Sequence, residues 1–434
     1  MPVRGRRPDI KVVGCHRVHA TMVPPDDASR PTRRSFLKGG ATAVAIGVST
    51  ALSGCTGNLP PLSSKLRYGN VDVPDAGPPK YRRWVPAERG SETDEGWIVT
   101  YAEPGPFDGP VPEEFVARRG FLKMELDHFG IGYENYDSLT TTNLATVIEA
   151  DFTADDVAST LADTGYEPDG SYRGYDVYSR SDVRRRAAVR DGVIVWASAY
   201  RHDDPDIEAT IDAGHGHSRQ YHEASEAFAA VTDAVGASRL LYIGGSHPGL
   251  NSGIAELGAD AFRIDDGVAY QLLIEWYENA SAGSEDQMQR ALEQQQHELT
   301  KEAKTIDIKD DGHFATVTAR VPTQPGRERD PMDDLPQITW GGRFDAATRT
   351  VTLRHEAGES ADSDLICYDI DTPEDRGEVE KKPLWPDQHT VSAGDETTVD
   401  LSDEPTAEGI SVVYGPLDDV SFRMLFTLPL EADR

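Results

Sequence analysis

Three Asp-Gly pairs, each standing between two β-prone runs, constrain the fold of this chain more than any other feature. They are Asp191-Gly192 in RRAAVRDGVIVWASA, Asp266-Gly267 in AFRIDDGVAYQLLIEWYE and Asp311-Gly312 in KTIDIKDDGHFATVTARV. A two-residue hairpin turn needs positive φ angles, which Asp and Gly tolerate, and the twist of such a turn matches that of the flanking strands. The sequence therefore predicts an antiparallel hairpin at each pair.

Helical patterns are interleaved with these hairpins. Residues 113–131, EEFVARRGFLKMELDHFGI, place four apolar side chains on one helical stripe: Phe115, Leu122, Leu126 and Phe129. A second helix should open at Thr153, with Asp155 and Asp156 in its first turn, where carboxylates suit the helix dipole. Antiparallel hairpins with helices on one side imply an α+β domain, which we place at 95–321.

The order of elements within this domain recurs. Aligning VRDGVIVWAS on IDDGVAYQLLIEW brings the flanking helices roughly into step, although the spacings differ. One interpretation is an internal duplication of an α+β module. The other is that helix, hairpin and helix simply form a common order.

The remaining segments differ in composition from this domain. From Gln337 onward the helical period disappears, and short β runs separated by turn residues predict an all-β sandwich of about six or seven strands at 337–434. A charged, proline-rich linker at 322–336 precedes it. Residues 55–94 hold six prolines and few apolar runs, which predicts a stalk of extended, poorly packed backbone.

The stretch TRRSFLKGGATAVAIGVSTALSGC, residues 32–55, indicates export. Its residues Arg33, Arg34, Phe36 and Leu37 resemble the twin-arginine signal, and residues 39–53 carry no charge. Leu52-Ser53-Gly54-Cys55 resembles a lipobox, in which a peptidase cuts before the cysteine and its thiol receives a lipid. The resemblance implies a signal at 1–54 and a lipid anchor on Cys55. The alternative is an uncleaved signal anchor.

The upstream residues bear on where this signal begins. Starting at Met22 would give the signal a conventional short basic region, and the residues before Met22 are not needed for export. We therefore expect the true start to be Met22.

The charge of the chain indicates the solvent in which it folds. Removing the nine basic and three acidic residues of positions 1–54 from totals of 43 Lys+Arg and 75 Asp+Glu leaves 34 and 72, a net charge of −38. Only eight of those basic residues are lysines. This acid-rich, lysine-poor composition resembles that of haloarchaeal proteins, whose self-repulsion is screened in molar salt. It argues against nucleic acid as a partner, which requires a basic surface.

Two pieces of the C-terminal region resemble the β-sandwich domain of archaeal type IV pilins. They are VTLRHEAGESADSDLICYDID at 351–371 and TVSAGDETTVDL at 390–401, which share the order of a strand, His-Glu, a Gly-rich turn and a second strand. This chain carries a lipoprotein-type signal in place of the pilin signal and assembly helix. The resemblance therefore implies a sandwich at a cell surface and does not extend to filament assembly.

The densest set of possible metal ligands lies in residues 202–226. It comprises His202, His215, His217, His222 and Glu226. Zinc or copper needs three or four such groups, and the i, i+4 spacing of His222 and Glu226 would place both on one helical face. The alternative is a solvated, Gly-rich loop.

Motifs for catalysis or cofactors are not evident. The sequence has no P-loop, dinucleotide-binding fingerprint or C-x-x-C, and Pro248 stands where a nucleophile elbow around Ser246 would need glycine. We therefore predict no cofactor and favour a non-enzymatic protein.

Together these patterns predict a membrane-anchored extracellular lipoprotein that binds or scaffolds at the cell envelope. One alternative is an envelope metal-binding protein or enzyme that uses His215, His217 and His222. The other is a protein associated with a surface filament. The expected partners are the membrane, through a lipid on Cys55, and a protein of the envelope.

Overall fold

The computed structural model describes the chain from Tyr68 to Leu430 with internal gaps. The described residues are 68–88, 96–106, 110–199, 201–202, 204–245, 255–279, 285–295, 303, 305–323, 335–373, 379–418 and 422–430. They belong to one compact unit, Lys65–Arg434, and the preceding unit, Met1–Ser64, lies outside them. The described part is mostly β, with large antiparallel sheets and few helices. None of these helices is long and apolar enough to cross a membrane.

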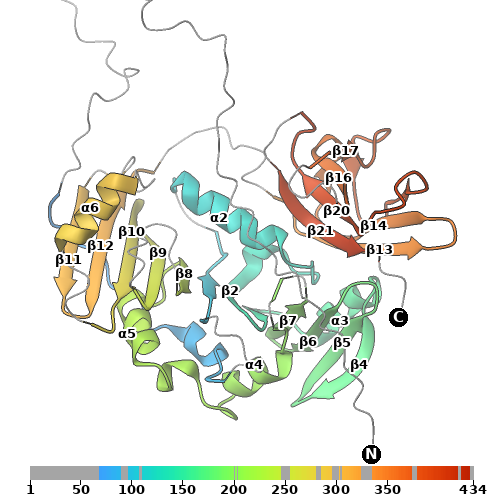
Figure 1. Ribbon diagram of the computed structural model, residues 1–434. Coiled ribbons are helices and arrows are strands. Elements are labelled where there is room, and N and C mark those ends of the chain that lie inside the picture. Colours follow the sequence, from blue (N-terminus) through green and yellow to red (C-terminus); the bar gives the residue numbers. More distant parts are fainter. Residues whose placement is uncertain are drawn as a thin grey trace, which may run out of the picture. The chain divides into compact units, whose positions relative to one another are not determined.

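One antiparallel sheet of twelve strands organises the first part of this unit (Figure 1). The strands lie side by side in the order β11-β12-β10-β9-β8-β1-β2-β3-β7-β6-β5-β4. In chain order they are β1 (Val99–Ala102), β2 (Tyr136–Thr142), β3 (Thr146–Ala150), β4 (Glu167–Tyr172), β5 (Tyr175–Arg180), β6 (Arg185–Arg190), β7 (Val193–Ser198), β8 (Leu240–Gly244), β9 (Leu257–Asp265), β10 (Val268–Trp276), β11 (Thr305–Asp311) and β12 (Phe314–Val321).

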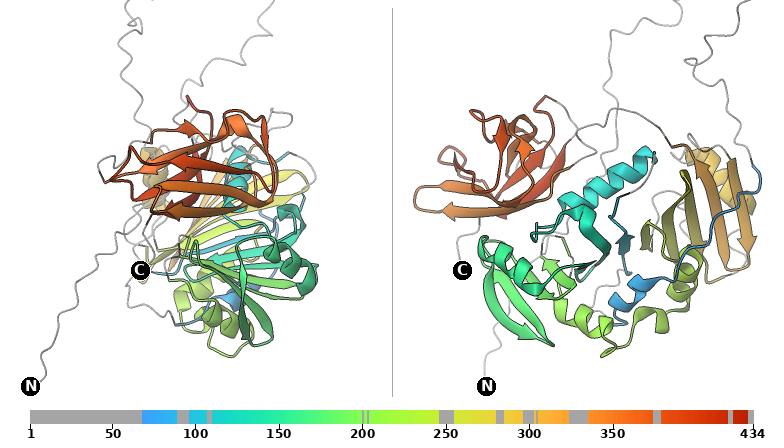
Figure 2. Two further views of the ribbon diagram at one scale, coloured as in Figure 1. Left: turned by 90° about the vertical axis from the view of Figure 1, so that its right-hand side faces the viewer. Right: turned by 180° about the vertical axis from the view of Figure 1, so that it is seen from behind.

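Helices cover both faces of this sheet (Figures 1 and 2). They are α2 (Glu113–Met124), α3 (Ala154–Ala162), α4 (Ile207–Gly214), α5 (Glu226–Val235) and α6 (Glu285–Gln295). In β7, Ile194 and Trp196 pack into the cluster that holds α2, α3 and α6, whereas Val193 and Val195 pack with α4. The expectation of helices on one side is therefore wrong, because these strands are apolar on both faces and each face must be covered.

The hairpin turns form close to where the sequence predicts them. Asp191-Gly192 joins β6 to β7, and Asp266-Gly267 joins β9 to β10 with φ angles of 45° and 72°. In the third hairpin Asp311 pairs with Phe314, so the turn lies one residue later than predicted.

The predicted start of the second helix is confirmed. Thr153 caps α3 by accepting a hydrogen bond from the N–H of Asp156, and the Asp156 side chain accepts in return from the N–H of Thr153. This reciprocal pair satisfies two backbone donors that the first turn of a helix leaves without partners.

The two hairpins aligned in the sequence occupy different places in the sheet. Strand β3 leads through α3 to β4, and β10 leads through α6 to β11. In both cases the joined strands run parallel, with antiparallel strands between them. The hairpin of β9 and β10 precedes its crossover helix, whereas the hairpin of β6 and β7 follows one. The topology therefore does not support the equivalence that the alignment suggested.

Residues 68–88, which we call the strap, lie within the expected stalk but pack against the sheet. The 3₁₀-helix η1 (Lys80–Trp84) buries Tyr81 and Trp84, each 1% exposed. The Trp84 ring lies so close to the end of α4 that a Cβ added at Gly214 would stand 1.9 Å from it. The stalk expectation is therefore wrong over these residues, because buried aromatic rings fix the strap to the fold.

The strap begins along one edge of the sheet. Tyr68 forms a parallel bridge with Ile306 in β11, and the N–H of Gly69 donates to the Ile306 carbonyl at 3.0 Å. The N–H of Val71 donates to Asp307 Oδ2 at 3.3 Å. Since an edge strand leaves backbone groups open to other chains, the strap protects part of β11 from such pairing.

Strands β13 to β21 form smaller sheets, ordered β13-β14-β19, β17-β16-β20-β21 and β15-β18. They are β13 (Ile338–Asp345), β14 (Thr350–Gly358), β15 (Ala361–Asp362), β16 (Ile366–Asp371), β17 (Lys382–Pro383), β18 (Thr390–Val391), β19 (Glu396–Asp400), β20 (Gly409–Tyr414) and β21 (Arg423–Pro429). One hydrophobic cluster joins Trp340 and Val351 of the first sheet to Ile366 and Phe426 of the second. The two sheets therefore share a core. Most of the expected linker, 324–334, lies outside the described residues.

The packed strap predicts a large effect of Trp84→Ala. Removing this buried indole should lower the free energy of unfolding by about 3–5 kcal/mol, because it leaves a cavity against α4. Denaturant titration of the full chain measures the change. Lys80→Ala, which shortens an exposed side chain in the same 3₁₀-helix, is the control and should change it by less than about 0.5 kcal/mol. Equal stability of the two variants would contradict the packing.

Candidate functional site

The residues expected to direct export and anchoring lie outside the described residues. They are Arg33, Arg34, Phe36, Leu37 and Cys55. Their roles remain predictions from the sequence.

The histidine-rich segment closes α4. His215 follows the last residue of this helix, and its Nε2 lies 2.9 Å from the hydroxyl of Tyr175. Its ring also contacts Trp84 edge to face, with the centroids 5.9 Å apart. The ring of His217 is 6.5 Å from that of His215. His215 is thus part of the packing between the strap, α4 and the sheet.

The proposed metal ligands do not gather around one point. His222 lies in the 3₁₀-helix η3 (Tyr221–Glu223), whereas Glu226 begins α5, so the expected i, i+4 pair on one helix does not form. Within the described ranges, no three His, Cys, Asp or Glu side chains are grouped so as to hold a metal ion. The described residues of this segment therefore form no metal centre.

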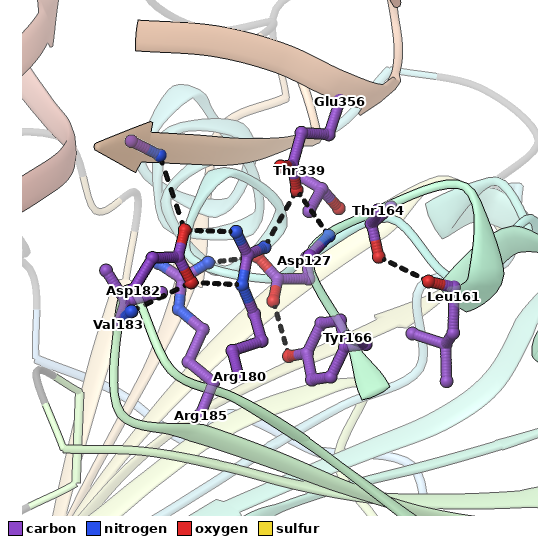
Figure 3. A network of polar contacts seen from close by, with 12 residues as sticks. Asp127, Leu161, Thr164, Tyr166, Arg180, Asp182, Val183, Arg185, Thr339 and Glu356 are labelled. Carbon is purple, nitrogen blue, oxygen red and sulfur yellow. Dashed lines mark hydrogen bonds and ion pairs between the residues drawn. The ribbon is translucent and has the colours of Figure 1, made fainter. Parts of the chain in front are cut away.

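A group of buried charges lies where the twelve-stranded sheet meets β13 and β14 (Figure 3). Arg180 in β5 and Arg185 in β6 stand directly opposite each other across their hairpin. Like charges in opposed positions destabilise a sheet unless each is neutralised. Because both side chains are buried, nearby carboxylates must supply that neutralisation.

Arg180 is neutralised from both sides of the junction. Its Nε and Nη2 donate to the two oxygens of Asp182 at 2.9 and 2.6 Å, and its Nη1 lies 3.0 Å from Glu356 Oε2 in β14. Backbone N–H groups complete the set, since Gly165 donates to Glu356 at 3.1 Å and Gly342 donates to Asp182 at 3.3 Å. Burial raises the pKa of the Glu356 carboxyl, and the charge of Arg180 opposes that rise.

Arg185 is neutralised from within the first part of the unit. It forms an ion pair with Asp127, which also accepts a hydrogen bond from the hydroxyl of Tyr166 at 2.7 Å. The indole N–H of Trp196 donates to that hydroxyl at 2.9 Å. The guanidinium lies 5.6 Å from the ring centroid of Phe426 in β21, within the range of a cation–π contact.

A pocket of about 150 Å³ opens beside Arg185. Its lining comes from the end of α2, from β6, β7 and the turn after β7, and from β21: Phe121, Met124, Glu125, Arg185, Trp196, Ser198, Arg201, Met424 and Leu425. The pocket thus combines two guanidinium groups and one carboxyl with an apolar wall. A larger hollow of about 490 Å³ lies near Asp369 in the second group of sheets.

The carboxyl in this pocket is perturbed. Burial raises the pKa of Glu125 to about 7, even though Arg201 Nη2 lies 2.5 Å from its Oε2 and favours the charged form. Arg201 also lies over the ring of Phe121, 5.9 Å from its centroid. The pair therefore changes its charge near neutral pH.

His202 fixes the turn that carries Arg201. Its Nδ1 accepts the N–H of Ser198 at 3.0 Å, which leaves Nε2 to donate to Thr146 Oγ1 at 3.2 Å. Burial lowers the pKa of His202 to about 3, so the ring stays neutral. This histidine therefore positions its neighbour.

The sequence reasoning missed this pocket. One signal was present, since arginines at 184–186 form an unusual basic run in a strongly acidic chain. Nothing in that run, however, shows that α2 and β21 approach it.

Comparisons with known proteins add little. No family model and no curated protein matches the chain. Two solved structures, crystal forms III and I of TP0453, are similar at 8% and 9% sequence identity with TM-scores of 0.33 and 0.34. Each match covers 57% of this chain, and 95% and 94% of those chains respectively. Likeness at this level carries no argument about fold or function.

The raised pKa of Glu125 predicts a pH dependence of stability. The folded protein holds this proton more tightly than the unfolded chain does, so the contribution of Glu125 to stability falls as the pH rises from about 4.5 to about 7. Glu125→Gln removes that loss. The free energy of unfolding of the variant, relative to the unsubstituted protein, should therefore increase by about 2 kcal/mol between pH 5 and pH 8.

Denaturant titrations at several pH values measure this difference. Glu113→Gln, at an exposed position on the same helix, is the control and should give a flat difference. A flat difference for Glu125→Gln as well would contradict the perturbed carboxyl.

Proposed function

We propose that this chain is a lipoprotein exported by the twin-arginine route and held at the extracellular face of the cell membrane by a lipid on Cys55. There it acts as a binding or scaffolding module of the envelope. The observation that carries the proposal is the run from Thr32 to Cys55, in which paired arginines, an uncharged stretch and a lipobox follow in order. A cysteine with two chains would anchor a domain stably, whereas one chain binds marginally.

The packed strap limits how far the folded unit can stand from its proposed anchor. Thirteen residues lead from Cys55 to Tyr68, where the strap meets β11. Even fully extended, they span no more than about 45 Å. A stalk of forty residues would reach roughly three times as far. The proposal is therefore of a domain held close to the membrane.

The charge supports folding in molar salt. Several described arginines form ion pairs with acidic side chains of the same chain, as Arg118 does with buried Asp260 at 2.7 Å. The acid excess beyond those pairs must be screened by the solvent. Export through the twin-arginine route fits such a chain, because it would fold in a saline cytoplasm before crossing.

The proposal also includes a division of the chain into domains. We regard residues 95–321 as an α+β domain and residues 337–434 as a β-sandwich. The shared core of the two small sheets supports the sandwich. Nucleic acid is not a partner in this proposal.

Cys55→Ser tests the anchor. The variant should move from the membrane fraction to the medium or accumulate as an unprocessed precursor, because the thiol that carries the lipid is gone. Fractionation and intact mass measure both outcomes. Cys367→Ser, at a buried position in β16, is the control and should stay in the membrane fraction at the mass of the lipidated protein. Unchanged fractionation and mass for Cys55→Ser would favour an uncleaved signal anchor.

The dependence of folding on salt concentration tests the proposal that the negative charge is an adaptation to a saline solvent. In dilute buffer the purified chain should lose its near-UV circular dichroism, and molar KCl should restore it, because the Debye length falls to about 3 Å at 1 M salt. A signal that is the same at both salt concentrations would contradict adaptation to a saline solvent.

A further inference from the structure

The pocket beside Arg185 has the composition of an anion site. Two guanidinium groups, from Arg185 and Arg201, line it in a chain whose net charge is −32. Arginine provides planar donors that match a carboxylate. The remaining wall is largely apolar and includes Met124 and Leu425.

Arg185 has a donor that the protein leaves without an acceptor. Its side chain is 9% exposed and its Nη1 pairs with Asp127, but its buried Nε has no hydrogen-bond partner in the described part of the chain. A buried donor without a partner costs about 1–3 kcal/mol. Asp127 therefore does not satisfy every donor of the Arg185 guanidinium.

Arg201 can exchange its present partner, the Glu125 carboxyl, for an anionic ligand. Its side chain is 27% exposed, and the ring of Phe121 beneath it belongs to a side chain that is 40% exposed. Arg201 pairs with Glu125, whose pKa of about 7 leaves the carboxyl about half protonated at pH 7. An incoming anion can therefore take the place of a partner that is easily protonated.

The size of the pocket limits the occupant. About 150 Å³ is well below the roughly 300–1,000 Å³ of pockets that enclose drug-sized ligands. Only a small anion fits, and the apolar wall favours one with a short hydrocarbon part.

We propose that this pocket binds a small organic carboxylate, with its charged end at Arg185 and Arg201 and its apolar end against Met124 and Leu425. The inference goes beyond the proposed lipid anchor and does not rest on it, because binding is measured on the purified protein. A free acid and the C-terminus of a peptide share this chemistry, and the experiment distinguishes them.

Binding should strengthen as Glu125 is protonated. The charged and titratable groups that face this carboxyl are Arg201 from the turn after β7, Arg185 from β6 and Tyr133 from the 3₁₀-helix η2 (Tyr133–Asn135). Below pH 7 the proton removes a negative charge that competes with the ligand. Affinity should therefore be up to about tenfold higher at pH 6 than at pH 8.

Saturation-transfer NMR on the full chain in molar KCl tests the proposal, with hexanoate as the probe and hexanamide as its uncharged analogue. Hexanoate should receive saturation and hexanamide should not. Arg201→Gln should weaken hexanoate binding by about tenfold or more, the loss expected for a hydrogen bond to a charged group. Near-UV circular dichroism establishes that this variant is folded.

Arg186→Gln is the matched control. Arg186 is the neighbour of Arg185 in β6, but it pairs with Glu208 at 2.9 Å and does not line the pocket. It should leave binding unchanged. A tripeptide ending in leucine, compared with its C-terminal amide, forms the second arm, and preference for the free peptide acid over hexanoate identifies a peptide terminus as the source. No saturation of either acid, equal saturation of hexanamide, or full binding by Arg201→Gln would overturn the proposal.

Discussion

The junction between the twelve-stranded sheet and strands β13 and β14 depends on the ion pairs of the buried Arg180 guanidinium. The pairing of β5 with β6 places Arg180 opposite Arg185, and two buried like charges cannot stand there alone. Asp182 neutralises Arg180 locally, but Glu356 comes from β14, more than 170 residues later. Breaking such a pair leaves a buried charge and costs about 3–5 kcal/mol. The charge balance of one hairpin thereby holds the second group of sheets against the first.

The same junction explains why the pocket exists. Phe426 lies over Arg185 from β21, and the neighbouring Leu425 reaches the pocket wall. The end of α2 supplies the opposite wall through Met124. Arginine suits this position better than lysine, because its planar group can serve Asp127, a ring and a third partner at once. An acid-rich chain thus concentrates rare positive charge where three elements meet.

The features that the sequence predicted depend on neighbouring residues. The turn at Asp266-Gly267 needs two positive φ angles, and the cap at Thr153 needs an acid three residues later, so both can be read from a few positions. The strap and the pocket depend on partners far along the chain. Proline-rich composition favours an extended backbone, but it does not show that Trp84 would lie against Gly214. The i, i+3 spacing of Tyr81 and Trp84 is the local feature of the sequence that indicates a buried face.

The strap joins the sheet far from the pocket in the order of strands. The strap joins the sheet at β11, one edge, whereas Arg185 and Trp196 line the pocket from β6 and β7 near the other. Eight strand spacings of about 4.8 Å lie between β11 and β7, so the path along the sheet is roughly 40 Å. A tether that meets β11 therefore leaves the pocket away from the attachment point.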